Sequence, residues 1–257
     1  MRATHFAPVG APVWFDLSSS DPAKSKAFYE GIFGWTAQET APEFGGYVNF
    51  LKGDVQIAGM MQNPGQGAPD GWTTYLKSDD AQATAAAITA AGGTVIFEPM
   101  DVMGLGQMAI ALDPTGAVVG VWQPGTMPGY GLTDEAGTPV WHELQTRDFA
   151  GEVSFYEKAF GWQTEVMSDT EEFRYTLLKA GEEQYAGVMD GTNYYPEGVP
   201  STWEVYIGVD DVDATIAKAL ELGGSVVQAA ENSSFGRLAK IADPTGGTIK
   251  LSSLAAE

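Results

Sequence analysis

Cysteine is absent from this sequence of 257 residues, and histidine occurs only twice. The lack of cysteine excludes disulfide bonds, thiolate metal sites and cysteine nucleophiles. Basic residues are also scarce, with 13 lysines and arginines against 34 aspartates and glutamates and a formal net charge of -21. Such an acidic chain repels phosphate backbones and anionic lipid headgroups. We therefore expect no nucleic-acid partner and no membrane-surface role.

Long apolar runs are missing as well. No stretch approaches the roughly 20 apolar residues of a membrane-spanning helix, and residues 1–12 lack the apolar run of a signal peptide. These absences predict a cytoplasmic protein. The composition, 44% hydrophobic and 11% aromatic, is that of an ordinary globular protein, and the length suits one large domain or two of common size.

A repeated segment decides between these two possibilities. The octapeptide Phe-Tyr-Glu-Gly-Ile-Phe-Gly-Trp from Phe28 to Trp35 recurs as Phe-Tyr-Glu-Lys-Ala-Phe-Gly-Trp from Phe155 to Trp162, an offset of 127 residues. Six of the eight positions are identical. Two further pairs of segments match at similar offsets: Pro12-Val-Trp14 with Pro139-Val-Trp141, and Asp113-Pro-Thr-Gly116 with Asp243-Pro-Thr-Gly246.

The repeat predicts two tandem domains of one fold. Copy 1 comprises residues 1–124 and copy 2 comprises residues 137–257. Residues 125–136 between them are rich in glycine and proline and show no periodic apolar pattern. We therefore expect these residues to form a linker.

Each copy begins with a strand and a short helix. Side chains of two kinds alternate over residues 13–18, which is typical of a strand with two different faces. Asp21-Pro22 then predicts a helix start, because aspartate is a favoured N-cap and proline a favoured first helical residue. Three strand-like runs follow, and the second half of each copy repeats this order. The chain thus reads as four β-α-β-β-β modules, an α+β fold in which each pair of modules forms a cupped mixed sheet with helices on its convex face.

These motifs resemble the vicinal oxygen chelate superfamily, which includes glyoxalase I, extradiol dioxygenases and bleomycin-resistance proteins. The resemblance rests on the Asp-started helix ending in Phe-Tyr-x-x-x-Phe-Gly-Trp, the Gly-Gly stop after the second helix and the closing Asp-Pro-x-Gly turn. The tandem layout looks most like the actinobacterial glyoxalase-like members. The resemblance implies two glyoxalase-like domains, but not one function, because this fold hosts isomerases, dioxygenases, transferases and drug-binding proteins.

Metal-using members of the superfamily carry histidine, glutamine or glutamate ligands on the concave face of the sheet. Counted from the shared motifs, the ligand positions are Trp14, Thr73 and Gly120 in copy 1 and Trp141, Glu204 and Lys250 in copy 2. Only Glu204 is a metal-binding residue, whereas a protein site needs at least two or three such ligands. We therefore expect no metal ion of the family type and no other cofactor.

Neither histidine is expected to act in a site. His142 shares a strand face with Val140 and Leu144, so strand alternation predicts a half-buried, hydrogen-bonded side chain that packs under a helix. His5 precedes the first predicted strand.

The same alternation predicts which side chains face each cavity. They are Trp14, Asp16, Thr73, Tyr75 and Trp122 in copy 1, and Trp141, Glu143, Gln145, Glu204, Tyr206, Arg237 and Lys250 in copy 2. Aromatic walls with a few polar groups are typical of a small-molecule site. The alternative is that Trp14 and Trp141 fill the cavities.

Three functions of different classes are therefore open. The first is a metal-independent protein of the bleomycin-resistance type that binds an antibiotic or aromatic metabolite, and the acidity suits a cationic ligand. The second is a metal-free isomerase, cyclase or lyase of secondary metabolism. In it Glu204 would act as general acid or base in a largely apolar cavity, and Tyr206 would orient an oxygen atom. The third is an interaction protein with filled cavities.

The first two functions share a small-molecule partner. The sequence leaves open whether the chain is an enzyme, whether it forms a homodimer, and whether the cavities form within one copy or between the two.

Overall fold

The computed structural model describes residues 7–65 and 67–254 of the chain. His5 lies outside the described residues. No helix in these two ranges is both long enough and apolar enough to cross a membrane. The elements of copy 1 are β1 (Pro12–Ser19), α1 (Pro22–Phe33), β2 (Thr36–Glu39), β3 (Val48–Lys52), β4 (Val55–Gln62), β5 (Gly71–Lys77), α2 (Ala81–Ala90), β6 (Thr94–Asp101), β7 (Gly106–Leu112) and β8 (Val118–Pro124), with a short 3-10 helix at Pro42–Phe44.

Copy 2 repeats this order of strands and α-helices. Its elements are β9 (Pro139–Thr146), α3 (Phe149–Phe160), β10 (Gln163–Asp169), β11 (Arg174–Ala180), β12 (Glu183–Asp190), β13 (Thr202–Val209), α4 (Val212–Glu221), β14 (Ser225–Ser233), β15 (Gly236–Ala242) and β16 (Thr248–Ser253).

The strands of each copy form one mixed sheet of eight strands. The strand order is β2-β3-β4-β1-β5-β8-β7-β6 in copy 1 and β10-β11-β12-β9-β13-β16-β15-β14 in copy 2. The two modules of a copy join in the middle of the sheet, where β1 pairs antiparallel with β5 and β9 with β13. This topology confirms the expected α+β fold of paired β-α-β-β-β modules, and it shows that each cupped sheet forms within one copy.

Local sequence signals explain where the helices begin and end. All four α-helices start at an aspartate whose side chain accepts a hydrogen bond from a backbone N–H group of the first turn: Asp21, Asp80, Asp148 and Asp211. The first helix of each copy ends at a glycine in the left-handed conformation, Gly34 with a φ of 65° and Gly161 with a φ of 69°. These turns return the chain to the edge strands β2 and β10.

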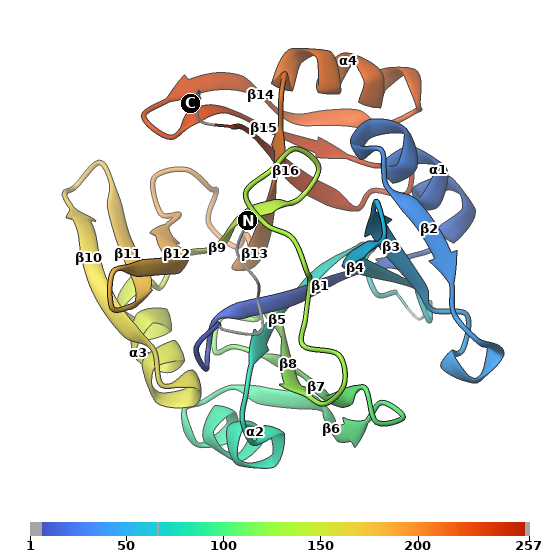
Figure 1. Cartoon of the computed structure of the whole chain (residues 1–257). Helices are drawn as coiled ribbons and strands as arrows, with labels where there is room; N and C mark the ends of the chain where they lie inside the picture. Colours follow the sequence, from blue (N-terminus) through green and yellow to red (C-terminus); the bar gives the residue numbers. More distant parts are fainter. Residues whose placement is uncertain (1–6, 66, 255–257) are drawn as a thin grey trace.

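The two sheets pack with their convex faces toward each other. Figure 1 shows α1 beside α4 and α2 beside α3, so each helix pair joins one helix of each copy. Between the pairs the central strands meet, and the rings of Phe15 and His142 lie 6.0 Å apart. The Nδ1 atom of His142 lies 3.1 Å from Oγ1 of Thr74. His142 is fully rather than half buried, and burial lowers its pKa to about 3.

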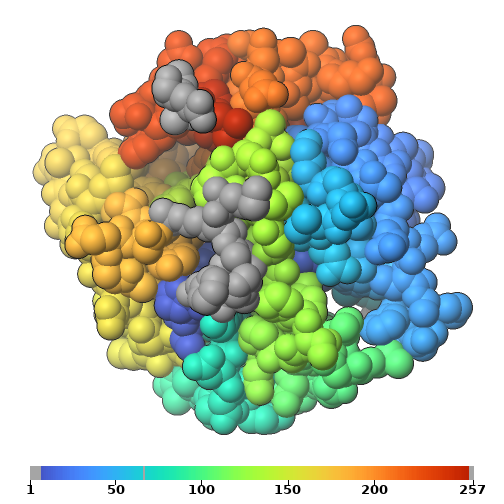
Figure 2. All heavy atoms as spheres, in the orientation of Figure 1, coloured from blue at the N-terminus to red at the C-terminus, as the bar shows by residue number. Residues whose placement is uncertain are grey.

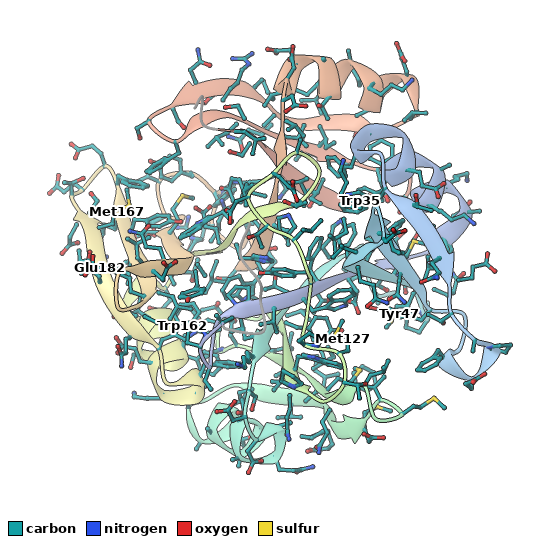
Figure 3. All side chains as sticks on the ribbon, viewed as in Figure 1. Trp35, Tyr47, Met127, Trp162, Met167 and Glu182 are labelled. Carbon is teal, nitrogen blue, oxygen red and sulfur yellow. The ribbon has the colours of Figure 1, made fainter. Side chains whose placement is uncertain are left out.

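Reciprocal hydrogen bonds from two tryptophans tie the copies together. Trp35, which follows α1, donates its indole N–H to the carbonyl oxygen of Gly137 at 2.7 Å. Trp162, which follows α3, donates to the carbonyl oxygen of Gly10 at 3.0 Å. Both tryptophans point toward the middle of the molecule in Figure 3. The repeated Phe-Gly-Trp motif therefore ends a helix in its own copy, and its tryptophan hydrogen-bonds to the backbone just before the first strand of the other copy.

The Asp-Pro-Thr-Gly turns also reach across the interface, where Asp113 meets α3 of copy 2 and Asp243 meets α1 of copy 1. Asp113 accepts a hydrogen bond from the Tyr156 hydroxyl at 3.2 Å, and Asp243 accepts one from the Ser25 hydroxyl at 2.7 Å. In copy 2 the position of Ser25 is taken by Glu152, which is fully buried. Glu152 lies close to Asp113 and Thr115, but neither of its carboxyl oxygens has a well-aligned hydrogen bond to a described residue. The part of the interface between Asp113 and α3 thus holds two buried carboxyl groups, those of Asp113 and Glu152.

Burial raises the pKa of Glu152 from its ordinary value of 4.5, and the charge of Asp113 raises it further. The folded protein therefore keeps a proton on this side chain at pH values where the unfolded chain has released it. A group with a raised carboxyl pKa makes the folded state less stable as pH rises from the unfolded to the folded pKa. This part of the interface opposes folding most strongly at alkaline pH.

Replacing Glu152 with glutamine tests this effect. We expect Glu152→Gln to match the wild type in free energy of unfolding near pH 5, and to exceed it by about 2 kcal/mol at pH 9, because the amide removes a buried ionisable group without changing its shape. Urea unfolding at both pH values measures the difference. The exposed Glu157 on the same helix gives the matched control Glu157→Gln, which should show no such dependence on pH. Equal stability of wild type and Glu152→Gln at pH 9 would contradict the account.

Candidate functional site

The concave face of copy 1 is lined at its centre by Trp14 and Asp16 of β1 and by Tyr75 of β5. Phe15 points to the opposite face, where it meets His142. Strand alternation therefore turns Trp14 and Asp16 into the concave side. The antiparallel register places Trp14 opposite Tyr75. We call this concave face cup 1.

A buried carboxyl group in cup 1 accepts hydrogen bonds from two tyrosines. The hydroxyl of Tyr75 donates to Oδ2 of Asp16 at 3.1 Å, and the hydroxyl of Tyr47, just before β3, donates to the same oxygen at 3.2 Å. The indole N–H of Trp14 donates to the Tyr47 oxygen at 2.9 Å. Asp16 itself is only 6% exposed. Carboxyl, phenols and indole thus form one hydrogen-bonded cluster.

The electrostatics of this cluster are dominated by desolvation. Burial raises the pKa of Asp16 from 3.8 to about 7, although the hydrogen bonds from Tyr75 and Tyr47 lower it. Burial, and then the charge of Asp16, raises the pKa of both tyrosine hydroxyls well above 10, so they remain hydrogen-bond donors. In the described part of copy 1 no lysine or arginine forms an ion pair with Asp16.

Copy 2 builds the same cluster with a glutamate. The hydroxyls of Tyr175 and Tyr206 donate to the two carboxylate oxygens of Glu143 at 2.9 and 2.8 Å. The indole N–H of Trp141 donates to the Tyr175 oxygen at 2.8 Å. We call the concave face of copy 2 around Glu143 cup 2. The repeat therefore preserves an indole, two phenols and a carboxyl in each cup.

Two glycines make room for the first tyrosine of each cluster. A Cβ atom on Gly59 of β4 would lie 1.7 Å from the Tyr47 hydroxyl oxygen, and one on Gly187 of β12 would lie 2.0 Å from that of Tyr175. Only glycine at these positions lets the tyrosine cross the strand and reach the carboxyl group. Sequence reasoning missed Tyr47 and Tyr175, although each tyrosine and its glycine recur in both copies at an offset of 128 residues.

Cup 2 adds polar partners that surround its carboxyl group. Lys250 donates to the Tyr206 hydroxyl at 2.9 Å, and its ammonium lies 3.8 Å from Glu143. Gln145 donates to Glu143 at 2.6 Å, and Tyr195 in turn donates to Gln145. Burial lowers the pKa of Lys250, while the charge of Glu143 raises it. The charge of Glu143 is therefore offset by a buried cation.

A second ion pair lies beside this group. The ammonium of Lys240 on β15 lies 2.5 Å from a carboxylate oxygen of Glu204 on β13, and Glu204 is 3% exposed. The expectation that Glu204 works in a largely apolar cavity is therefore wrong. Lys240 comes from β15, a strand that alternation within β13 does not reveal, and its ammonium stands where an apolar wall was expected.

Cup 1 is apolar where cup 2 is charged. In place of Lys250, Lys240 and Glu204, cup 1 has Gly120, Ile110 and Thr73. Trp122 of β8 and Met108 of β7 lie opposite each other in the register, and they extend the apolar lining of cup 1. The indole N–H of Trp122 donates to the carbonyl oxygen of Met127 in residues 125–136 at 2.9 Å.

The opening of cup 1 is visible on the surface. In Figure 2 the molecule is hollowed between β6, β7 and residues 125–136, drawn in green, and the β2–β3 region, drawn in blue. Figure 3 places Tyr47 and Met127 on either side of this hollow. Residues 125–136 thus form one wall of the cup.

The structure brings most of the predicted site residues together. Cup 1 gathers Trp14, Asp16, Thr73, Tyr75 and Trp122, and cup 2 gathers Trp141, Glu143, Gln145, Glu204, Tyr206 and Lys250. Arg237 is the exception, and its predicted place in the cavity is corrected. Its guanidinium pairs with Asp213 of α4 at 2.7 Å, on the helix side of the sheet, because Arg237 shares a strand face with the buried Ala239 and Ile241.

The family's metal positions in cup 1 do not fit a metal ion. Trp14 offers an indole N–H that is already donated to Tyr47, and Thr73 offers only a neutral hydroxyl. The third position, Gly120, has no side chain and is covered by Tyr75, whose ring lies 2.2 Å from where a Cβ atom would be.

Cup 2 fits a metal ion no better. Glu204 is paired with Lys240, and the third position holds the ammonium of Lys250, whose charge repels a cation. Over residues 7–65 and 67–254, no group of three or more histidine, aspartate or glutamate side chains is placed to hold a metal ion. The donor set of each cup is that of a hydrogen-bonding site.

Comparison with protein families agrees with this architecture. Residues 11–121 match the glyoxalase/bleomycin resistance protein/dioxygenase superfamily, and residues 141–252 match a glyoxalase-like domain. The chain is 37% identical to the glyoxylase-like protein CFP32 of Mycobacterium tuberculosis over 243 residues, 92% of each chain. It is 38% identical to the anthracycline biosynthesis protein DnrV of Streptomyces peucetius over 262 residues, 95% of this chain and 92% of that protein.

Solved structures share the fold at low sequence identity. The Mn(II)-bound glyoxalase from Novosphingobium aromaticivorans superposes with a TM-score of 0.65 at 16% identity, over 96% of this chain and 83% of that one. The 2,2',3-trihydroxybiphenyl 1,2-dioxygenase of Sphingomonas wittichii superposes with a TM-score of 0.61 at 13% identity, over 96% and 91%. Together with the two tandem cups, these matches show that the chain belongs to the glyoxalase/bleomycin resistance protein/dioxygenase superfamily, as a tandem two-domain member.

Proposed function

We propose that this chain binds an aromatic small molecule, an antibiotic or a related metabolite, in its two cups without a metal ion. The observation that carries this proposal is the cluster of one indole, two phenols and one carboxyl group at the bottom of each cup, in place of the family's metal ligands. Such a cluster offers flat apolar surfaces together with directed hydrogen-bonding groups. That combination is typical of sites that hold an aromatic ligand bearing hydroxyl or carbonyl groups.

The relatives support the same ligand class. DnrV and the DauV protein of Streptomyces strain C5, each 38% identical to this chain, are named for anthracycline biosynthesis. Both match over 95% of this chain, so the likeness includes both cups. An anthracycline or a related aromatic compound is therefore the first ligand to test.

A metal-free enzyme, an isomerase, cyclase or lyase, is the second candidate. The observation that favours it is the chain of hydrogen bonds from Lys250 through Tyr206 to Glu143, which links an ammonium, a phenol and a carboxylate over two contacts of 2.9 and 2.8 Å. Linked groups of this kind can pass a proton to or from a bound ligand. In this second candidate Glu204, which is paired with Lys240, would contribute a negative charge to the site and would not carry the proton.

Calorimetric titration with a panel of anthracyclines and simpler anthraquinones tests the binding function. We expect binding in the wild type, and a weakening by about 5- to 30-fold in the affected cup for Tyr75→Phe and for Tyr206→Phe, because each change removes one hydroxyl from the cluster. Tyr194→Phe is the matched control, since Tyr194 is exposed and lies outside both cups. If no member of the panel gives a binding signal, the cups are filled, and the chain is better explained as an interaction protein.

The charge balance of cup 2 gives a second prediction. The ammonium of Lys250 lies 3.8 Å from the buried carboxylate of Glu143, and replacing Lys250 with methionine removes this cation. We expect Lys250→Met to lower the free energy of unfolding by about 3 kcal/mol at pH 8, because the change leaves a buried charge without its partner. The control is Lys179→Met, because the Lys179–Glu165 pair lies at the surface and its loss should have a much smaller effect. Similar losses for both variants would show that cup 2 does not depend on its buried cation.

A further inference from the structure

The two cups differ most at their carboxyl groups, although the surrounding clusters match. Asp16 meets Tyr47, Tyr75 and, across the register, Thr73, and these are its polar neighbours from the strands packed against it. Glu143 meets the equivalent tyrosines and, in addition, Lys250. Among the described residues, the equivalent buried acids thus differ in their partners: Glu143 lies beside a cation in cup 2, and Asp16 lies beside neutral groups in cup 1.

The walls of cup 1 extend its apolar character to the opening. Phe97 and Met100 of β6 lie opposite Ile110 and Met108 in the register and therefore on the same face. They are 57% and 53% exposed, which is unusual for side chains of this size. In cup 2 the strand equivalent to β6, β14, faces the cup with Gln228 and Glu231 instead, opposite Lys240 and Leu238. Cup 1 is thus shaped for a neutral apolar ligand and cup 2 for a more polar one.

We infer that Asp16 is a catalytic acid–base residue, which moves a proton to and from a neutral aromatic ligand that carries an enolisable carbonyl group in cup 1. This inference rests on the proposed binding function, and it names the chemistry of that site. The geometry that carries it is a carboxyl group that is buried among apolar walls, paired with no cation of residues 7–65 and 67–254, and held by two hydroxyl donors.

The proton transfer balances without a cofactor. The Asp16 carboxylate takes the proton from the carbon next to the carbonyl group, the electron pair of that C–H bond forms a carbon–carbon double bond, and the carbonyl electron pair moves to oxygen. Because a neutral carboxylic acid accepts hydrogen bonds more weakly than a carboxylate, a tyrosine hydroxyl is released to donate to that oxygen. Asp16 then returns the proton to the same or a neighbouring carbon, and the net change is exchange or isomerisation.

The acidity of Asp16 suits this role. Burial raises its pKa to about 7, so the acid and the carboxylate are both populated near neutral pH, as a group that takes and returns a proton requires. Tyr47 and Tyr75, the titratable groups in contact with it, have pKa values raised well above 10 and do not compete for the proton in this range.

Deuterium exchange of 2-tetralone, a neutral bicyclic aromatic ketone, tests the inference on the full chain. In D₂O we expect the wild type to accelerate exchange at the carbon next to the carbonyl group about 100-fold over buffer, followed by proton NMR. The acceleration should rise with pH through about 7, as the Asp16 carboxylate forms. Asp16→Asn should reduce exchange to the buffer rate, and Asp16→Glu, which copies the glutamate of cup 2, should restore part of it.

The controls separate catalysis from binding and folding. Asp54→Asn, in the exposed turn after β3, makes the same chemical change outside the cup and should leave the exchange rate at the wild-type value. If 2-tetralone binds, as shown by line broadening, but exchanges at the buffer rate, the acid–base role is wrong and the binding function stands. Failure to bind at millimolar concentration overturns the ligand class inferred for cup 1, while the anthracycline titration still decides the binding function.

Discussion

A buried carboxyl group held by two tyrosine hydroxyls is the contact on which both cups depend. In each copy it joins the central strands to the strands of the first module, because the first tyrosine crosses a glycine to reach it. It also explains the tryptophan at the family's first ligand position, since the indole N–H orients that same tyrosine. Each cup is therefore organised around hydrogen bonds that the fold itself positions.

The two copies share this cluster and differ in its surroundings. Cup 2 has the lysines Lys240 and Lys250 beside its carboxylates, whereas cup 1 has a glycine, an isoleucine and a threonine at the positions of Lys250, Lys240 and Glu204. The copies pack back to back through their convex faces, so both cups open away from the interface and can diverge independently. The two cups thus differ in polarity: cup 1 is an apolar concave face with one buried acid, and cup 2 is a polar one with paired charges.

Much of this architecture can be predicted from the sequence, because the repeat and strand alternation are local signals. They place Trp14, Asp16 and Glu143 on the concave face correctly. They do not place Tyr47 or Tyr175, whose contacts depend on pairing between strands distant in sequence. The Lys240–Glu204 pair is missed for the same reason, whereas the error at Arg237 is one of alternation, because Arg237 shares the helix-side face of β15 with Ala239 and Ile241. Contacts across strands need the register, which alternation within one strand does not supply.

The most direct measurement of the central claim is a crystal structure of the chain with an anthracycline or anthraquinone bound. We expect ligand density inside a cup, with a ligand oxygen or ring within hydrogen-bonding or stacking distance of the Asp16 or Glu143 cluster and no metal ion between them. A ligand that is bound only outside both cups, or one that is held through a metal ion at the family positions, would contradict the account.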